Sequence, residues 1–139
     1  MTLPALQFPF VETDPKVGSA SRMPYLPVTL SLGQRSLQVS GLADTGAAIN
    51  VLPNSIGLRL GAVWDQQPTS VQLSGNLASV EARVLVVMAV VGNFPAVQLA
   101  FAWAKSDGMP VIFGEVNFFM EFDACFFRSR SVFEVRPKA

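Results

Sequence analysis

The first regular pattern along the chain is an alternation of apolar and polar positions between Tyr25 and Ser40. A period of two is typical of a β-strand with one buried face. Gly33 and Gln34 interrupt the alternation and supply the residues of a tight turn. The pattern therefore predicts a β-hairpin whose second strand runs directly into Asp44, so this acidic residue should lie in a loop just beyond a strand end.

Similar short patterns recur through the rest of the chain and predict further strands. These strands are expected at residues 71–73, 80–91, 97–103, 110–114, 124–127 and 132–135. The strand expected at residues 80–91 is apolar on both faces from Val84 onward, as expected for a strand that is buried on both sides. Many short strands separated by turns predict an all-β, barrel-like fold.

Two short helices and an N-terminal arm complete the prediction. One helix is expected from Pro53 or Asn54 to Gly61, and the other at residues 115–122. Several prolines argue against a helix in residues 1–24, where residues 6–12 suit an edge strand because proline is tolerated there. We therefore expect an arm or edge strand at residues 1–24 and one domain at residues 25–139.

Composition narrows the classes of partner. The 139 residues suit one domain, with 50% hydrophobic residues, 14% charged residues and zero formal net charge. No basic stripe indicates binding to nucleic acid. The longest strongly apolar run, at residues 84–91, is too short for a membrane span. The N-terminus lacks a basic region followed by a secretory-type apolar run, so we expect a cytoplasmic protein.

The side chains available for catalysis are few. The chain has no histidine, which excludes Ser-His-Asp and Cys-His catalysis and His-containing metal sites. A single cysteine allows neither an internal disulfide nor a zinc cluster. Cys125 lies between Ala124 and two phenylalanines, which favours a core thiol over a nucleophile. Carboxylates remain as the main catalytic groups, and no cofactor is expected.

Asp44 is the carboxylate in the most unusual surroundings. It lies in the apolar, small-residue segment Leu42–Pro53, where an ionised group is costly unless it is hydrogen-bonded or takes part in chemistry. Thr45 and Gly46 follow it, with a hydroxyl and a free backbone that can hold a carboxylate in place. The alternative is a turn in which the Asp and the Gly serve only backbone geometry.

The segment Ala43–Ala47 resembles the active-site signature of aspartic proteases, in particular the retroviral, or retropepsin-like, type. The context agrees with this resemblance, because a strand pair precedes the motif and a short helix follows it. Residues 71–83 could form the flap, and Val111–Gly114 is similar to the family's second motif of two apolar residues and a glycine. The resemblance covers roughly residues 26–137. It implies a closed retropepsin-like β-barrel, with bacterial single-domain members as the expected relatives.

The resemblance also implies a homodimer. Aspartic proteases use two carboxylates that share one proton, because like charges about 3 Å apart cannot both stay ionised. This chain has a single Asp-Thr-Gly, so a second copy is expected to supply the second Asp44 at a two-fold axis. The implied function is an aspartic endopeptidase acting on peptide or protein substrates. The alternative is a catalytically inactive dimer of the same fold that binds peptides or partner proteins.

The resemblance assigns roles to individual residues. Asp44 is the expected catalytic acid, Thr45 is expected to join the two active-site loops, and Gly46 to let the backbone approach the carboxylates. The residues expected to contact substrate are Ala47, Ala48, Ser74, Gly75, Asn76, Leu77, Ile112 and Phe113. Gly114 is expected to pack against the loop. Taken alone, the tip at Gly75 suits an ordinary hairpin turn almost equally well, and Val111–Gly114 is a plain core strand.

Overall fold

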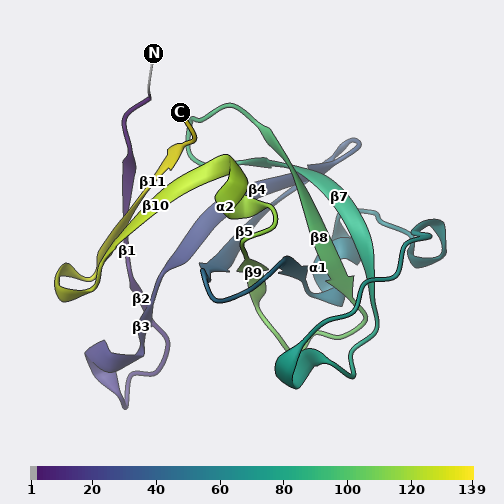
Figure 1. Cartoon of the computed structure of the whole chain (residues 1–139), viewed down its shortest axis with the longest axis horizontal. Coiled ribbons are helices and arrows are strands. Elements are labelled where there is room, and N and C mark those ends of the chain that lie inside the picture. Colours follow the sequence, from purple (N-terminus) through teal and green to yellow (C-terminus); the bar gives the residue numbers. More distant parts are fainter. Residues whose placement is uncertain (1–2) are drawn as a thin grey trace.

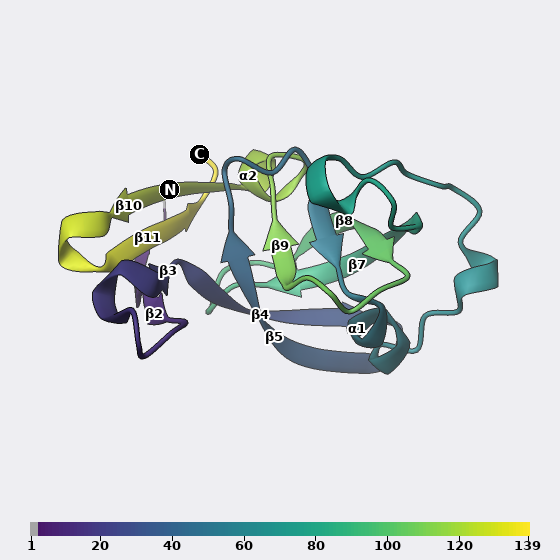
Figure 2. The ribbon, with the colours of Figure 1, turned by 90° about the horizontal axis from the view of Figure 1, so that it is seen from below.

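Six strands close into a barrel in the computed structural model, which describes residues 3–139 (Figures 1 and 2). Their order around the barrel is β4-β5-β9-β6-β8-β7. The bounds are Tyr25–Leu32 for β4, Arg35–Ala43 for β5, Asn50–Leu52 for β6, Ala82–Val90 for β7, Val97–Ala104 for β8 and Val111–Phe113 for β9. The closed β-barrel predicted from the sequence is confirmed.

The predicted hairpin is formed by β4 and β5, which pair from Tyr25 with Leu42 to Leu32 with Arg35. The alternate residues Leu26, Val28 and Leu30 are at most 1% exposed, because the period of two turns them all into the barrel. This apolar face explains why the register is fixed, since a slip of one residue would expose it to water. The end of β5 is thereby fixed at the barrel rim, next to Asp44.

The short strand β9 lies between β5 and β6 and brings the two predicted motifs together. It runs parallel to β5, with Ala43 opposite Phe113, and antiparallel to β6. A Cβ on Gly41 would lie 2.3 Å from the Phe113 ring, so only glycine allows β5 and β9 to pack this closely. Phe113 in turn stacks on Phe118, with ring centroids 4.7 Å apart, in the main core. The ends of β5 and β9 therefore lie side by side.

A second, three-stranded sheet lies beside the barrel, with the order β1-β11-β10 (Figure 1). Its strands are β1 at Leu6–Pro9, β10 at Phe122–Phe127 and β11 at Val132–Pro137. The predicted edge strand is present, and the strands predicted at residues 124–127 and 132–135 pair antiparallel as the hairpin β10–β11. Two shorter strands, β2 at Val11–Glu12 and β3 at Arg22–Met23, form a hairpin around a 3-10 turn, η1 at Gly18–Ser21. Residues 1 and 2 of the predicted arm lie outside the described residues.

The prediction of a core thiol is wrong, because Cys125 is exposed. Along β10 the side chains of Phe122 and Ala124 face the core, where Phe122 is 1% exposed. Cys125 therefore points to the opposite face of the sheet, opposite Glu134 on β11. Apolar neighbours in sequence did not indicate burial here, since neighbours along a strand lie on opposite faces.

Both predicted helices are present, and the second is shorter than expected. The first, α1, spans Asn54–Arg59, and a Cβ on Gly57 would lie 2.2 Å from the Trp103 indole, so this glycine permits the packing of α1 on β8. The second, α2, spans only Phe118–Glu121. Glu115 and Val116 lie outside it and pair with the segment after β5: their N–H groups donate to the carbonyls of Ala47 and Ala48, and Val116 forms a parallel bridge with Ile49. No helix within residues 3–139 has the length and apolar character needed to cross a membrane.

The predicted strand at residues 71–73 is wrong. Only a single bridge forms there, between Ser70 and Arg83, and β7 begins at Ala82 rather than at residue 80. The Gln72 side chain donates to the carbonyls of Leu73 and Ala78, at 3.0 and 2.8 Å, and folds the segment onto itself. A 3-10 turn, η3 at Gly75–Leu77, takes the place of a hairpin tip. We call residues 69–80 the lid segment.

Candidate functional site

The Asp44 carboxylate is held in a tight loop that follows β5. The N–H of Gly46 donates to Asp44 Oδ1 at 2.9 Å, and the N–H of Ala47 donates to the Asp44 carbonyl at 3.1 Å. The N–H of Asp44 itself donates to the Phe113 carbonyl at 2.9 Å, which ties the loop to β9. Asp44 is half-buried. Backbone hydrogen bonds thus orient the carboxylate, which still reaches the surface.

Gly46 is suited to this loop because a side chain would crowd the carboxylate. A Cβ there would lie 3.2 Å from Asp44 Oδ1, which is closer than most Cβ contacts. Thr45 and Gly46 are both exposed at the rim of the barrel. Their predicted roles, with Thr45 joining two loops, concern a second copy of the chain and stay predictions.

The segment after β9 packs against the Asp44 loop. The resemblance implied this contact for Gly114. The N–H groups of Glu115 and Val116 donate to the carbonyls of Ala47 and Ala48, at 2.9 and 3.0 Å. A Cβ on Gly114 would lie 2.5 Å from the Ile49 carbonyl oxygen and 2.8 Å from that of Ala47. The two segments therefore touch through their backbones, and only glycine fits at the contact.

A groove of about 460 Å³ opens between the loop and the lid segment. It brings together eight of the residues predicted for the site: Asp44, Gly46, Ala47, Ala48, Ser74, Asn76, Leu77 and Ile112. Its remaining lining residues are Ile49, Val51, Val71, Gln72 and Leu73. Asp44 is the only charged residue among them. In Figure 2 the loop between β5 and β6 and the teal turn η3 lie at the same edge of the molecule.

Three predicted site residues do not line this groove. Gly75 adopts a positive φ of 64° at the start of η3 and is exposed away from the groove lining. Thr45 lies on the other side of the loop. Phe113 is 0% exposed in the barrel core, because alternation along β9 points it away from Ile112. We therefore assign Phe113 to support of the loop and not to contact with substrate.

A second hollow, of about 330 Å³, lies on the other side of Asp44. Its walls are Phe10, Met23, Pro24, Leu42, Ala43, Asp44, Thr45, Phe126 and Arg128. Met23 and Phe126 are each 37% exposed, which is high for large apolar side chains. We call this the flank hollow. Asp44 thus separates a groove that borders the lid segment from an apolar hollow that borders the three-stranded sheet.

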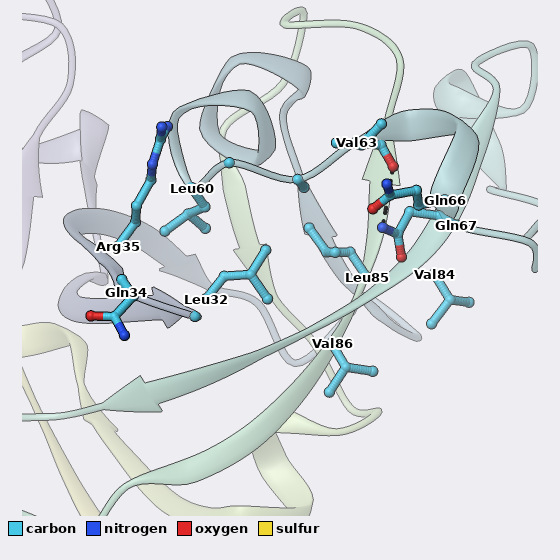
Figure 3. A pocket seen from close by; sticks show the side chains of 13 residues that line it. Leu32, Gln34, Arg35, Leu60, Val63, Gln66, Gln67, Val84, Leu85 and Val86 are labelled. Carbon is cyan, nitrogen blue, oxygen red and sulfur yellow. Dashed lines mark hydrogen bonds between the residues drawn. The ribbon is translucent and has the colours of Figure 1, made fainter.

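A larger hollow, of about 620 Å³, lies elsewhere on the barrel and lacks an acidic residue (Figure 3). Leu32 of β4, Leu60 just after α1 and Leu85 of β7 meet at its centre, with Gln66 and Gln67 to one side. Arg35 is its only charged residue. Size alone therefore does not single out the groove beside Asp44. Within residues 3–139, no group of three or more Cys, Asp or Glu side chains could hold a metal ion.

Sequence reasoning missed two residues that support the loop, Asn50 and Asn117. Asn50 is 0% exposed, and its Oδ1 accepts a hydrogen bond from the Gly114 N–H at 2.8 Å. A signal was present, since Asn50 is a polar residue inside the apolar run Ile49–Leu52. A buried amide must find hydrogen-bond partners, so its position in a strand next to the motif indicated a structural network.

Comparison with known proteins gives a likeness in structure and none in sequence. No protein-family model matches the chain, and no curated protein matches it. Among solved structures, a retropepsin-like aspartic protease from Rickettsia conorii is similar, with a TM-score of 0.61 and 10% sequence identity. The match covers 95% of this chain and 98% of that one. At this identity the likeness concerns the fold, and it confirms the predicted one: the chain has the fold of the retropepsin-like aspartic proteases.

Proposed function

We propose that the protein is an aspartic endopeptidase whose catalytic pair consists of Asp44 from each of two copies. One observation carries the proposal: a carboxylate oriented by the Gly46 N–H opens onto a groove lined mainly by apolar and small residues. A turn that served only backbone geometry would not require the acid to face such a groove. The retropepsin-like fold supports the same function at the level of the architecture.

The chemistry follows from two carboxyl groups that share one proton. The ionised Asp44 takes a proton from a water molecule while the oxygen of that water attacks the carbonyl carbon of the peptide bond. The protonated Asp44 of the second copy gives its proton to the carbonyl oxygen, which forms a tetrahedral diol. The first carboxyl then gives the proton it took from water to the peptide nitrogen. The second carboxylate takes a proton from one diol hydroxyl as the carbon–nitrogen bond breaks, so a carboxylic acid and an amine leave and the two carboxyl groups again share one proton.

The flank hollow supports the proposed homodimer. It exposes Met23 and Phe126 directly beside Asp44 and Thr45, where a second copy must approach if two Asp44 side chains are to meet. Apolar side chains of this size favour association when a partner covers them. The C-terminal hairpin of β10 and β11 borders the same hollow through Phe126 and Arg128, so we place it in the dimer interface.

The proposed substrates are extended peptide segments that lie in the groove, with Ser74, Gly75, Asn76 and Leu77 of the lid segment closing over them. Closure would exclude water from the reacting bond. The proposed location is the cytoplasm, which rests on the sequence pattern alone. A catalytically inactive peptide-binding dimer is the alternative outcome of the tests below.

The groove assignment predicts the effect of filling it. Ala48 is exposed in the groove, and its carbonyl accepts the Val116 N–H, a bond that a larger side chain leaves in place. Ala48→Phe is therefore expected to raise KM for a peptide about tenfold, which corresponds to about 1.4 kcal/mol of lost binding. The matched control is Ala96→Phe, at an exposed position outside the groove, which should leave KM unchanged. Equal KM values for both variants would contradict the assignment.

The function itself is tested with purified protein and an unstructured polypeptide, from acidic to neutral pH. Hydrolysis that a statine-type transition-state analogue blocks supports the endopeptidase, since such analogues bind far more tightly than substrates. Analogue or peptide binding without any hydrolysis at any pH supports the binding module. If the protein shows no binding and no hydrolysis, both the proposed function and the assignment of the groove are wrong.

A further inference from the structure

Asn50 is the buried polar side chain of the described structure, and every hydrogen-bonding atom of its amide is in use. Oδ1 accepts from the Gly114 N–H at 2.8 Å. Nδ2 donates to the Ala100 carbonyl at 3.0 Å and to Asn117 Oδ1 at 3.1 Å. A buried amide without partners costs free energy, so this full set of bonds makes the position stable and specific to Asn.

Asn117 completes the network from the other side. Its Oδ1 also accepts from the Ala100 N–H at 3.0 Å, and its Nδ2 donates to the Gln98 carbonyl at 2.9 Å. We call Asn50 and Asn117 together the amide clamp. It joins three pieces of chain that are distant in sequence: the start of β6, the middle of β8, and the segment after β9.

The side chains of the clamp reach the Asp44 loop through Gly114. The preceding residue, Phe113, accepts the Asp44 N–H at its carbonyl, and the following residue, Glu115, donates to the Ala47 carbonyl. Whatever fixes Gly114 therefore fixes the anchor points at both ends of the loop. The Gly114 N–H is the group that Asn50 holds.

We infer that Asn50, backed by Asn117, is a positioning residue that holds the Asp44 loop in its reactive geometry through Gly114. The inference rests on the proposed function, because it assigns a catalytic purpose to a buried hydrogen-bond network. Both amides are neutral and do not titrate, so the network is unchanged over the pH range in which a carboxyl pair works. The clamp thus fixes the loop without adding a charge next to Asp44.

The test is Asn50→Asp, which keeps the size of the side chain and changes its hydrogen-bonding pattern. An ionised Asp still accepts from Gly114, but it has no proton for the Ala100 carbonyl or Asn117 Oδ1 and would face two acceptors. Burial raises the pKa of the new carboxyl above its value in the unfolded chain. Stability and loop geometry are therefore kept in acid, where the protonated Asp regains a donor, and are lost as pH rises through the raised pKa.

We expect kcat of Asn50→Asp, relative to wild type, to fall about tenfold or more between about pH 4 and pH 7, with KM changed less than about twofold. The assay is run at a temperature where circular dichroism shows the variant to be folded, so global unfolding does not enter. Asn93→Asp, in an exposed turn, is the matched control and should follow wild type at every pH. A folded Asn50→Asp protein with the wild-type pH profile overturns the inference.

Amide hydrogen exchange decides the inference independently of activity. At neutral pH the Gly46 and Ala47 amides should exchange about tenfold faster in Asn50→Asp, while those of Val28 and Val39 in the β4–β5 hairpin keep their protection. Uniform acceleration would indicate a general structural role and overturn the positioning role. If wild type hydrolyses nothing, the proposed function fails, whereas local acceleration at the loop still supports the clamp.

Discussion

Asp44→Asn is expected to lower the rate of peptide hydrolysis about 10³-fold or more, because an amide can neither take a proton from water nor share one with a partner carboxyl. The fold should survive, since the amide oxygen of Asn can still accept the Gly46 N–H that Asp44 Oδ1 accepts now. The measurement is cleavage of a fluorogenic unstructured peptide, with thermal unfolding recorded for both proteins. A large loss of rate with little change in Tm places the defect in the chemistry.

Asp107→Asn is the matched control for this substitution. Asp107 is also a loop acid whose Oδ1 accepts a backbone N–H, from Ser55 at 2.8 Å, and its side chain is exposed. Its carboxylate lies outside the groove and the flank hollow, so neutralising it should leave the rate within about twofold of wild type. If Asp44→Asn and Asp107→Asn were equally active, Asp44 would have no catalytic role.

Gly114→Ala is expected to destabilise the protein by about 1–3 kcal/mol and to lower activity even where the protein is folded. The new methyl group would lie 2.5 Å from the Ile49 carbonyl oxygen and 2.7 Å from its carbon. Backbone atoms cannot rotate away as a flexible side chain can, so the Asp44 loop itself must move. Denaturant unfolding measures the stability, and cleavage of the same peptide measures the displacement of the loop.

The control for this glycine is Gly108→Ala, because there the nearest atom to the new Cβ is Ser106 Oγ at 3.4 Å, an ordinary contact distance. Both glycines lie outside the positive-φ region, so the comparison isolates the close approach and not backbone strain. A Gly114→Ala protein as stable and active as Gly108→Ala would show that the loop does not depend on this contact.

The elements that the sequence predicts well are those whose signal is local. The β4–β5 hairpin follows from a strict alternation around a glycine turn, and the placement of Asp44 beyond its end follows from the same count. Gly46 and Gly114 carry information of the same kind, because at each a side chain would crowd a neighbour inside or next to the motif: the Asp44 carboxylate at Gly46 and the Ile49 backbone at Gly114. These positions could be read without knowing the pairing of distant strands.

The errors arise where distant residues decide the outcome. The lid segment has the apolar pattern of a strand. However, the Gln72 side chain donates to the carbonyls of Leu73 and Ala78, which in a strand would accept hydrogen bonds from a neighbouring strand. Cys125 has apolar neighbours and yet faces outward, because the side of β10 that is buried depends on where the barrel lies. The amide clamp could not be assembled from sequence, since its members Asn50 and Asn117 are 67 positions apart.

The central claim is that Asp44 works only as a pair contributed by two copies. It is tested most directly by mixing wild-type protein with Asp44→Asn at constant total concentration, after conditions that allow the copies to exchange. If both carboxyls are needed, activity follows the square of the wild-type fraction, so an equal mixture retains roughly a quarter of the activity. A linear decrease, with roughly half retained, would mean that each chain acts alone and would contradict the account.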